Sequence, residues 1–134
     1  MGITLNELDV RRFREMLVKD RMSRRKREYA SRLASEIEQA EILPPDQIPA
    51  DVVTMRSLVR VRDTTTGTTQ TFHLVYPDEA DPDLLKISIL DPLGLAVIGE
   101  KVGATVSWES PQGRKSIVIE KMHYQPESLK QYYF

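Results

Sequence analysis

The sequence predicts an α+β protein, with a short antiparallel helical hairpin over residues 1–45 and an antiparallel β domain with one short helix over residues 46–134. Two observations predict this fold class. Apolar residues in the first part recur three and four positions apart, as in a helix, whereas from Leu58 onward they alternate with polar residues, as in a strand. The pair Pro44-Pro45 separates the two parts, because proline cannot continue a helical hydrogen-bond ladder.

The first helix is expected to begin after Asn6, whose side chain can cap the free amide groups of the first turn. Asp9 occupies the third helical position, near the positive end of the helix dipole. Leu5 and Val10 stand at the two positions of a hydrophobic staple. The apolar face of this helix consists of Val10, Phe13 and Leu17, with Met16 beside them.

The second helix has its own apolar face and is expected to end at Pro44-Pro45. Neither helix is apolar enough all round to be buried alone, so an antiparallel hairpin is the economical arrangement. Each arm would reach about 20–25 Å at about 1.5 Å per residue, with the charged stretch 19–27 at the tip. The apolar face is formed by Ala30, Leu33, Ala34, Ile37 and Ala40.

The β domain is expected to contain five strands. A turn at residues 64–68 joins the first two strands, and a turn at residues 111–113 joins the last two. An acidic, proline-bearing loop precedes the third strand. A short apolar stretch between Pro92 and Gly99 is expected to form one or two helical turns. The expected strands cover residues 58–62, 69–76, 86–90, 104–109 and 115–124, and the helix covers 93–98.

Composition excludes several classes of function. The 134-residue chain has a net charge of −1, which argues against general binding of polyanions. It contains no cysteine, which excludes disulfides, thiolate nucleophiles and cysteine zinc sites. No apolar run reaches the roughly 20 residues that span a bilayer, and the N-terminus lacks a signal-peptide layout. We therefore expect a soluble, cytoplasmic protein.

Residues 86–106 contain several short motifs in a fixed order, and together they resemble the C-terminal domain of the GreA/GreB elongation-factor superfamily. The segment departs from the family pattern at Asp91, where the family has serine, and at Ala104, where it has an acid. The motifs are Ile87-Ser88, Asp91-Pro92-Leu93-Gly94, Ala96-Val97-Ile98-Gly99 and the glycine at Gly103.

Three further segments, residues 49–55, 74–77 and 124–127, resemble the regulators of nucleoside diphosphate kinase, a short-fingered branch of that superfamily. The resemblance implies an N-terminal coiled coil on a C-terminal domain of the FKBP-like type. It also implies a partner, because Gre-type factors dock their C-terminal domain at the rim of the secondary channel of RNA polymerase. We expect a non-enzymatic, monomeric regulator that needs no cofactor and competes there with Gre-type factors.

The resemblance points to Asp91, Pro92, Leu93 and Gly94 as docking residues, together with Tyr76-Pro77. Proline fixes the start of a turn, glycine lets the backbone pass closely, and the leucine can be offered to a partner groove. The same four residues can also be a plain helix start, with an aspartate cap and proline at the first position. The two interpretations are compatible.

The expected tip of the hairpin argues against stimulation of transcript cleavage. Cleavage factors of this superfamily use two acidic tip residues to help hold a second magnesium ion. Here a single acid lies among cations, and the hairpin is short. The cations can contact an acidic surface of polymerase or phosphates of nucleic acid, or they can simply be solvated. The tip residues are Lys19, Asp20, Arg21, Arg24, Arg25, Lys26 and Arg27.

The sequence admits other functional interpretations. Direct contact with nucleoside diphosphate kinase or another metabolic enzyme is the alternative to polymerase binding. The implied FKBP-like domain raises the question of prolyl isomerase activity. We do not expect this activity, because fold does not carry function. His73 and His123 lack metal-ligand spacing, the acidic run 78–83 lacks the pattern of a calcium loop, and Trp108 is interpreted as structural. The three aromatic residues at the C-terminus, residues 132–134, either pack back on the domain or mark a contact surface.

Overall fold

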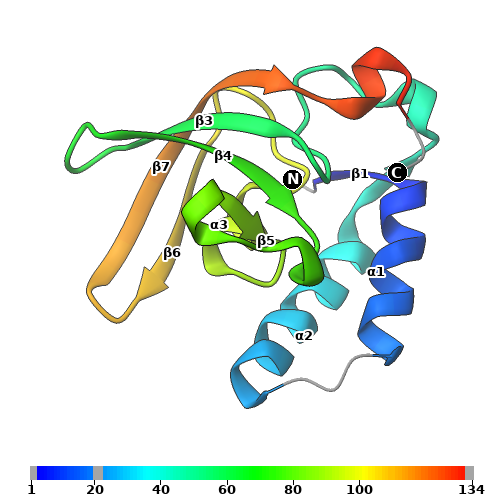
Figure 1. The fold of residues 1–134 in the computed structure, drawn as a ribbon, viewed down its shortest axis with the longest axis horizontal. Coiled ribbons are helices and arrows are strands. Elements are labelled where there is room, and N and C mark those ends of the chain that lie inside the picture. The colour runs from blue at the N-terminus through cyan, green and yellow to red at the C-terminus, as the bar shows by residue number, and fades with distance from the viewer. Residues whose placement is uncertain (1–2, 20–22, 132–134) are drawn as a thin grey trace.

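The computed structural model of the chain describes residues 3–19 and 23–131 (Figure 1). It confirms an α+β fold with three helices and one larger sheet. The N-terminal part contains β1 (Thr4–Asn6), α1 (Glu7–Lys19), α2 (Arg24–Gln39) and β2 (Glu41–Leu43). The rest contains β3 (Leu58–Asp63), β4 (Thr69–Val75), β5 (Lys86–Ser88), α3 (Pro92–Val97), β6 (Thr105–Ser110) and β7 (Gly113–Tyr124). Short 3-10 helices are η1 (Pro45–Gln47), η2 (Pro77–Glu79), η3 (Pro82–Leu84) and η4 (Pro126–Leu129).

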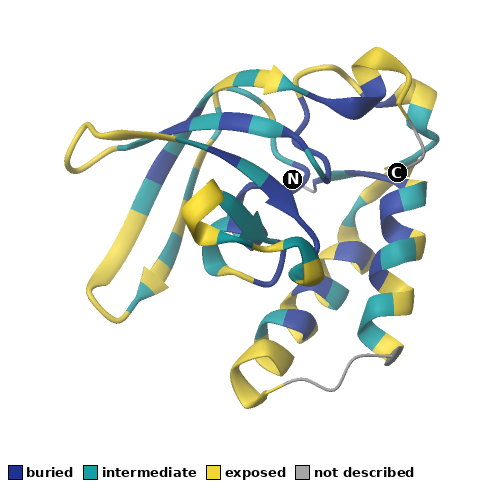
Figure 2. Ribbon diagram, viewed as in Figure 1, coloured by how far each residue is buried: buried dark blue, intermediate teal, exposed yellow. Residues whose placement is uncertain are grey.

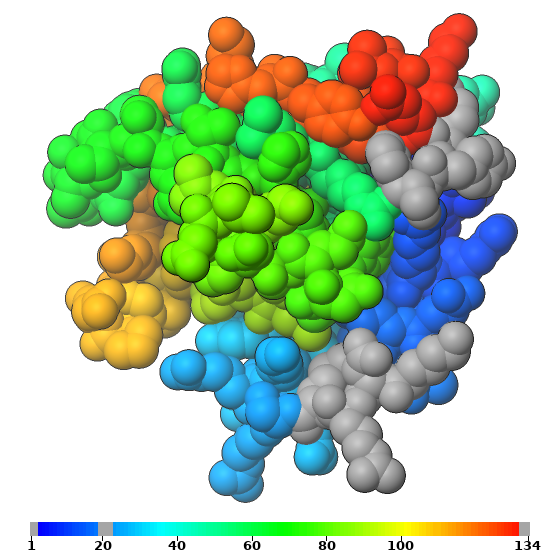
Figure 3. Space-filling model, viewed as in Figure 1, coloured from blue at the N-terminus to red at the C-terminus, as the bar shows by residue number. Residues whose placement is uncertain are grey.

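The larger sheet has the strand order β5-β4-β3-β7-β6 and curls around α3 (Figure 1). Its pairs are antiparallel except β4 and β5, which run parallel, with Val75 opposite Ser88. The expected purely antiparallel domain is therefore wrong, and the sheet is mixed. The reason is the long connection over residues 76–85, whose two 3-10 turns carry the chain back before β5 begins. This connection covers the middle of the face shown in Figure 3.

A second, two-stranded sheet lies at the base of the helical hairpin, where β1 precedes α1 and β2 follows α2. β1 and β2 pair in parallel, with Leu5 opposite Ile42, so the chain enters α1 and leaves α2 at the same place. The second helix therefore ends at Gln39 and not at the expected Pro44-Pro45. Glu41 leaves the helix because its amide donates to the carbonyl oxygen of Ile3 at 2.9 Å, which replaces the lost helical bond.

The two helices run in opposite directions and diverge away from β1 and β2 (Figure 1). The expected cap of α1 is confirmed, because the amide of Leu8 donates to Oδ1 of Asn6 at 2.8 Å. In α2, Ser23 is the cap and accepts from the amide of Lys26 at 3.3 Å. The coiled-coil form of the hairpin and the FKBP-like type of the β domain stay predictions.

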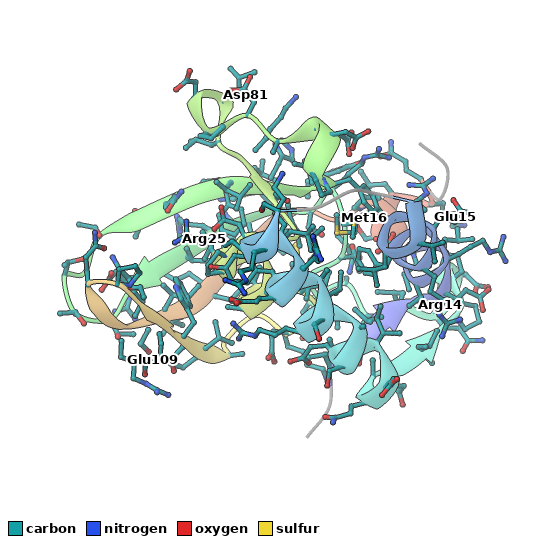
Figure 4. All side chains as sticks on the ribbon, turned by 90° about the horizontal axis from the view of Figure 1, so that it is seen from below. Arg14, Glu15, Met16, Arg25, Asp81 and Glu109 are labelled. Carbon is teal, nitrogen blue, oxygen red and sulfur yellow. The ribbon has the colours of Figure 1, made fainter. Side chains whose placement is uncertain are left out.

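One hydrophobic core runs from the inner faces of α1 and α2 into the concave side of the sheet (Figure 2). On α1, Met16 points inward while Glu15 points away from the molecule, as Figure 4 shows. The division of the chain at residue 45 stays a prediction, and this core crosses it. No helix in the described ranges is long and apolar enough to cross a membrane. The fully buried core side chains include Phe13, Leu33, Val59, Phe72, Leu74 and Ile119.

Candidate partner-docking site

The segment Asp91–Gly94 forms the start of α3. Asp91 is in the cap position with extended backbone, and Pro92 is the first helical residue, so the expectation of a helix start is confirmed. The Asp91 side chain, however, makes no capping hydrogen bond. Since this carboxylate is exposed and the fold does not use it as a cap, it remains available to an outside partner.

Gly94 serves close packing between α3 and β5. A Cβ atom placed on this residue would lie 2.3 Å from the carbonyl oxygen of Ser88 and 3.1 Å from the Cδ1 atom of Leu74. No side chain fits in that space, so glycine is needed for α3 to lie against the sheet. This close approach determines where Leu93, the preceding residue, stands.

Leu93 is half-buried and lines a hollow of about 220 Å³ on the concave side of the sheet. Val61, Trp108 and Ile117 supply further apolar lining from β3, β6 and β7. Trp108 packs partly against the core, in keeping with its expected structural role, and also faces this hollow. The remaining lining is polar and consists of Asp63, Thr68, Thr69, Gln70 and Lys115. An apolar floor with polar groups around it suits one apolar side chain of a partner.

Tyr76 is brought near this segment by the parallel pairing of β4 and β5, but its ring belongs to a different hollow. It is only 8% exposed and lies tilted against Phe13, with ring centroids 5.8 Å apart. The guanidinium groups of Arg12 and Arg56 lie 6.0 and 5.7 Å from its ring centroid. Burial, and secondarily the charge of Asp9, raises the pKa of Tyr76. The ring therefore stabilises the contact between α1 and the sheet.

Pro77 lines that second hollow, which has a volume of about 380 Å³ and lies between α1 and η2. Arg56 stands in it with a left-handed backbone (φ 66°) and pairs with Glu79, at 3.0 Å for its Nη2 atom and 3.3 Å for its Nε atom. Opposite charges thus lie next to each other here, so the hollow has no strong preference for a charged ligand. The other lining residues are Arg12, Met16, Tyr76 and Asp78.

The predicted basic tip is only partly within the described residues. Lys19 ends α1, and Arg24, Arg25, Lys26 and Arg27 form the first turn of α2, where all four are exposed. Asp20 and Arg21 lie outside the described residues, as do the terminal aromatics 132–134. No acidic residue occupies the first turn of α2. A partner for these cations stays a prediction.

A buried polar junction, formed by Asn6, Asp9, Thr54 and Glu127, was not anticipated from the sequence. Asp9 is 7% exposed and accepts from the amide of Met55 at 3.2 Å. Burial first, and the charge of Glu127 second, raises the pKa of Asp9 to about 7. Its position four residues before Phe13 places Asp9 on the buried stripe of α1, which is the sequence signal for its burial.

Metal ligation finds no support in the described parts of the chain. Within residues 3–19 and 23–131, no three histidine, aspartate or glutamate side chains gather closely enough to hold an ion. His73 is half-buried in β4, where burial and the charge of Lys86 lower its pKa, and His123 is exposed on β7. In the acidic loop, Glu79 is already engaged by Arg56.

The sequence also matches known proteins. Residues 48–124 match the family described as transcription elongation factor, GreA/GreB, C-term. The chain is 31% identical to the regulator of nucleoside diphosphate kinase from Escherichia coli (strain K12) over 131 residues, which cover 97% of this chain and 95% of that protein. It is 40% identical to the transcription elongation factor GreA of Thermodesulfovibrio yellowstonii over 79 residues, which cover 59% of this chain and half of that protein.

Solved structures agree with these matches. The GreA/GreB elongation factor from Nitrosomonas europaea superposes with a TM-score of 0.75 at 32% identity and covers 92% of this chain and 99% of that one. The matched residues 48–124 contain the whole larger sheet, α3 and the hollow beside Leu93. The chain therefore belongs to the GreA/GreB family of transcription elongation factors and is related to the regulators of nucleoside diphosphate kinase.

Proposed function

We propose that this protein is a non-enzymatic regulator that binds RNA polymerase at the rim of the secondary channel and does not stimulate transcript cleavage. It acts in the cytoplasm as a monomer, without a cofactor, and competes with Gre-type factors for the same place. The observation that carries the proposal is the position of Leu93: the motif that resembles the family's docking segment also lines the apolar hollow with Trp108.

The docking surface follows from the chemistry of this hollow. Its floor takes an apolar side chain of polymerase, and the exposed carboxylate of Asp91 next to it selects a basic neighbour. Gly94 acts indirectly, because it lets α3 approach β5. Pro77 lines the other hollow, against α1, and forms a second part of the proposed surface. Tyr76 contributes through packing, since its ring is nearly inaccessible to a partner.

The absence of cleavage stimulation follows from the hairpin. α1 has 13 residues and α2 has 16, which at about 1.5 Å per residue gives arms of about 20 and 24 Å. Much of that length packs against the protein's own core and does not project. The four cations at the start of α2 oppose binding of a second magnesium ion and suit phosphates or an acidic protein surface instead.

A competition experiment on halted elongation complexes tests the proposal. The purified protein is titrated against a cleavage-competent Gre factor, and the cleaved transcript is measured. The wild-type protein should suppress cleavage and cause none alone. Leu93→Ser should weaken suppression by about tenfold, the equivalent of about 1.4 kcal/mol of apolar contact. Leu84→Ser, which changes a leucine that is 62% exposed and lies outside the hollow, should have no effect.

Either of two results would overturn the proposal. If the wild-type protein neither binds polymerase nor competes, the partner is wrong. If it binds and stimulates cleavage, the conclusion drawn from the basic tip is wrong. Thermal unfolding of both leucine variants accompanies the assay, because Leu93 also packs partly against the core.

A second candidate function is direct contact with nucleoside diphosphate kinase or another metabolic enzyme. It is favoured by the full-length similarity to a protein named as a regulator of that kinase. Under this alternative, the immobilised protein retains purified kinase in the absence of polymerase. If the protein retains polymerase but not kinase, any effect on the kinase must be indirect, through transcription.

A further inference from the structure

Glu127, in η4 near the C-terminus, binds two segments that are far from it in the sequence. Its Oε2 atom accepts from Nδ2 of Asn6 at 2.6 Å, and its Oε1 atom accepts from Oγ1 of Thr54 at 2.7 Å. All three side chains are buried, with exposures of 7%, 4% and 1% for Glu127, Asn6 and Thr54. One carboxylate therefore connects the start of the hairpin, the segment after it and the end of the chain.

The amide of Asn6 has no freedom left in this arrangement. Its oxygen caps α1 by accepting from Leu8, while its nitrogen donates to Glu127. Thr54 is held in the same way, because its hydroxyl also bonds that of Ser57 at 3.1 Å. Both donors to Glu127 are thus fixed at their other side, which determines the direction from which each one approaches the carboxylate.

Further hydrogen bonds hold the same junction together. One turn into α1, Asp9 accepts from the amide of Met55, the neighbour of Thr54. Next to Glu127, Nε2 of Gln125 donates to the carbonyl oxygens of Pro49 and Val52, both at 2.7 Å. The C-terminal segment is therefore bonded to residues 49–54 and to Asn6, the cap residue of α1, so it joins the hairpin to the sheet domain.

Apolar packing alone does not determine the direction of α1. Contacts such as those of Phe13 are non-directional, and similar burial can be reached at several angles between helix and sheet. Short, buried hydrogen bonds are directional, and leaving one unmade in the interior is costly. In the observed orientation, Asn6 and Thr54 both donate to Glu127, so all three buried groups are satisfied.

We propose that Glu127 is a positioning residue which, through Asn6 and Thr54, sets the direction of the helical hairpin relative to the sheet domain. Its consequence for exclusion of other factors rests on the proposed function, whereas its effect on hairpin direction does not. The partner-docking hollow beside Leu93 lies apart from this junction, so docking and exclusion become separable properties.

The direction of the hairpin can be measured directly, because the chain has no cysteine of its own. Cysteines introduced at Val18, which is 85% exposed on α1, and at Thr65, which is exposed between β3 and β4, carry spin labels. Distances between them are measured by pulsed electron resonance. The wild-type background should give one narrow distribution, and Glu127→Ala should broaden or shift it.

Two further single variants, and their combination, separate the positioning role of Glu127 from other roles of the same residues. Asn6→Asp keeps the helix cap, because aspartate caps as well as asparagine, but it places a carboxylate against Glu127 and should broaden the distribution. Glu127→Gln should stay narrow, since an amide can accept from Asn6 and donate to Thr54. Adding Glu127→Gln to Asn6→Asp should restore the narrow distribution, because the glutamine amide donates to the new carboxylate. Glu109→Ala, at an exposed carboxylate bonded to Arg114, is the matched control.

Polymerase assays then read the functional consequence. If only about one molecule in ten holds the competent direction, suppression of Gre-stimulated cleavage should weaken about tenfold in Asn6→Asp, with binding to polymerase within about twofold of wild type. An unchanged distance distribution in Asn6→Asp and Glu127→Ala would overturn the proposal. If the distribution changes but suppression does not, Glu127 still sets the direction of the hairpin, but exclusion of Gre-type factors does not depend on that direction. If the wild-type protein neither binds polymerase nor suppresses cleavage, the proposed function fails, and the distance measurement still decides the role of Glu127. If Glu127→Ala does not fold, the pair Asn6→Asp and its Glu127→Gln rescue still decides.

Discussion

Replacing Asp9 with asparagine should remove a pH dependence of stability. Burial raises the pKa of Asp9 from 3.8 to about 7 in the folded protein. Between about pH 4 and about pH 7 the folded state therefore keeps a proton that the unfolded state has lost. Because the folded state binds more protons, the free energy of unfolding falls as the pH rises through this range.

The magnitude follows from the two pKa values. A difference of about three pH units, at about 1.4 kcal/mol for each, amounts to about 4 kcal/mol. Asparagine keeps the hydrogen bond from the amide of Met55, since its side-chain oxygen can accept as the aspartate does. Relative to wild type, the Asp9→Asn protein should therefore gain about 4 kcal/mol between about pH 4 and about pH 8.

Urea unfolding at several pH values measures this difference, with the fluorescence of Trp108, the single tryptophan, as the probe. Asp83→Asn, which changes an exposed carboxylate in η3, is the control and should follow the wild-type profile. Parallel pH profiles for Asp9→Asn and wild type would refute the reasoning, because they would mean that Asp9 titrates alike in the folded and unfolded states.

Four other substitutions test the packing and the backbone strain. Gly94→Ala should cost about 1–3 kcal/mol, since its Cβ would lie 2.3 Å from a carbonyl oxygen of β5. Gly67→Ala, which has open space but a φ of 76°, should cost only about 1 kcal/mol, and thermal unfolding that ranks the two in reverse would contradict this. Phe13→Ala should cost about 3–5 kcal/mol in urea unfolding because its ring is fully buried, and a loss below about 1 kcal/mol would mean that α1 is not part of the core. Leu85→Asn should stabilise the fold by up to about 1 kcal/mol and so raise the unfolding temperature slightly, because asparagine tolerates a φ of 57°. A lower unfolding temperature would count against backbone strain at this residue.

Side-chain period predicted the long elements well. The hairpin strands expected at 58–62 and 69–76 are observed as Leu58–Asp63 and Thr69–Val75, because alternation over six or more residues is a strong local signal. Three-residue strands carry no such signal. β1 and β2 form because the segments before and after the hairpin meet in space. Local sequence gives no sign of that meeting, and residues 41–43 were therefore expected to continue the helix.

The candidate site was predictable in its motif and not in its surroundings. The family resemblance identified Leu93, and its position at a helix start was expected from Pro92. Its neighbours Val61, Trp108 and Ile117 come from three strands whose pairing is a long-range property of the sheet. The resemblance singled out residues 124–127, but the role of Glu127 was missed for the same reason, because its partner Asn6 lies 121 positions away.

The parallel pairing of β1 and β2 gives the hairpin a base that does not depend on the length of its helices. Residues added in step to the two helices near their connection would leave Thr4 opposite Glu41 and the junction at Glu127 untouched. Each added turn would extend the arm by about 5.4 Å without changing its bearing. The length and the direction of the hairpin therefore depend on separate residues. Proteins that share this base can differ in the length of the hairpin while its direction stays the same.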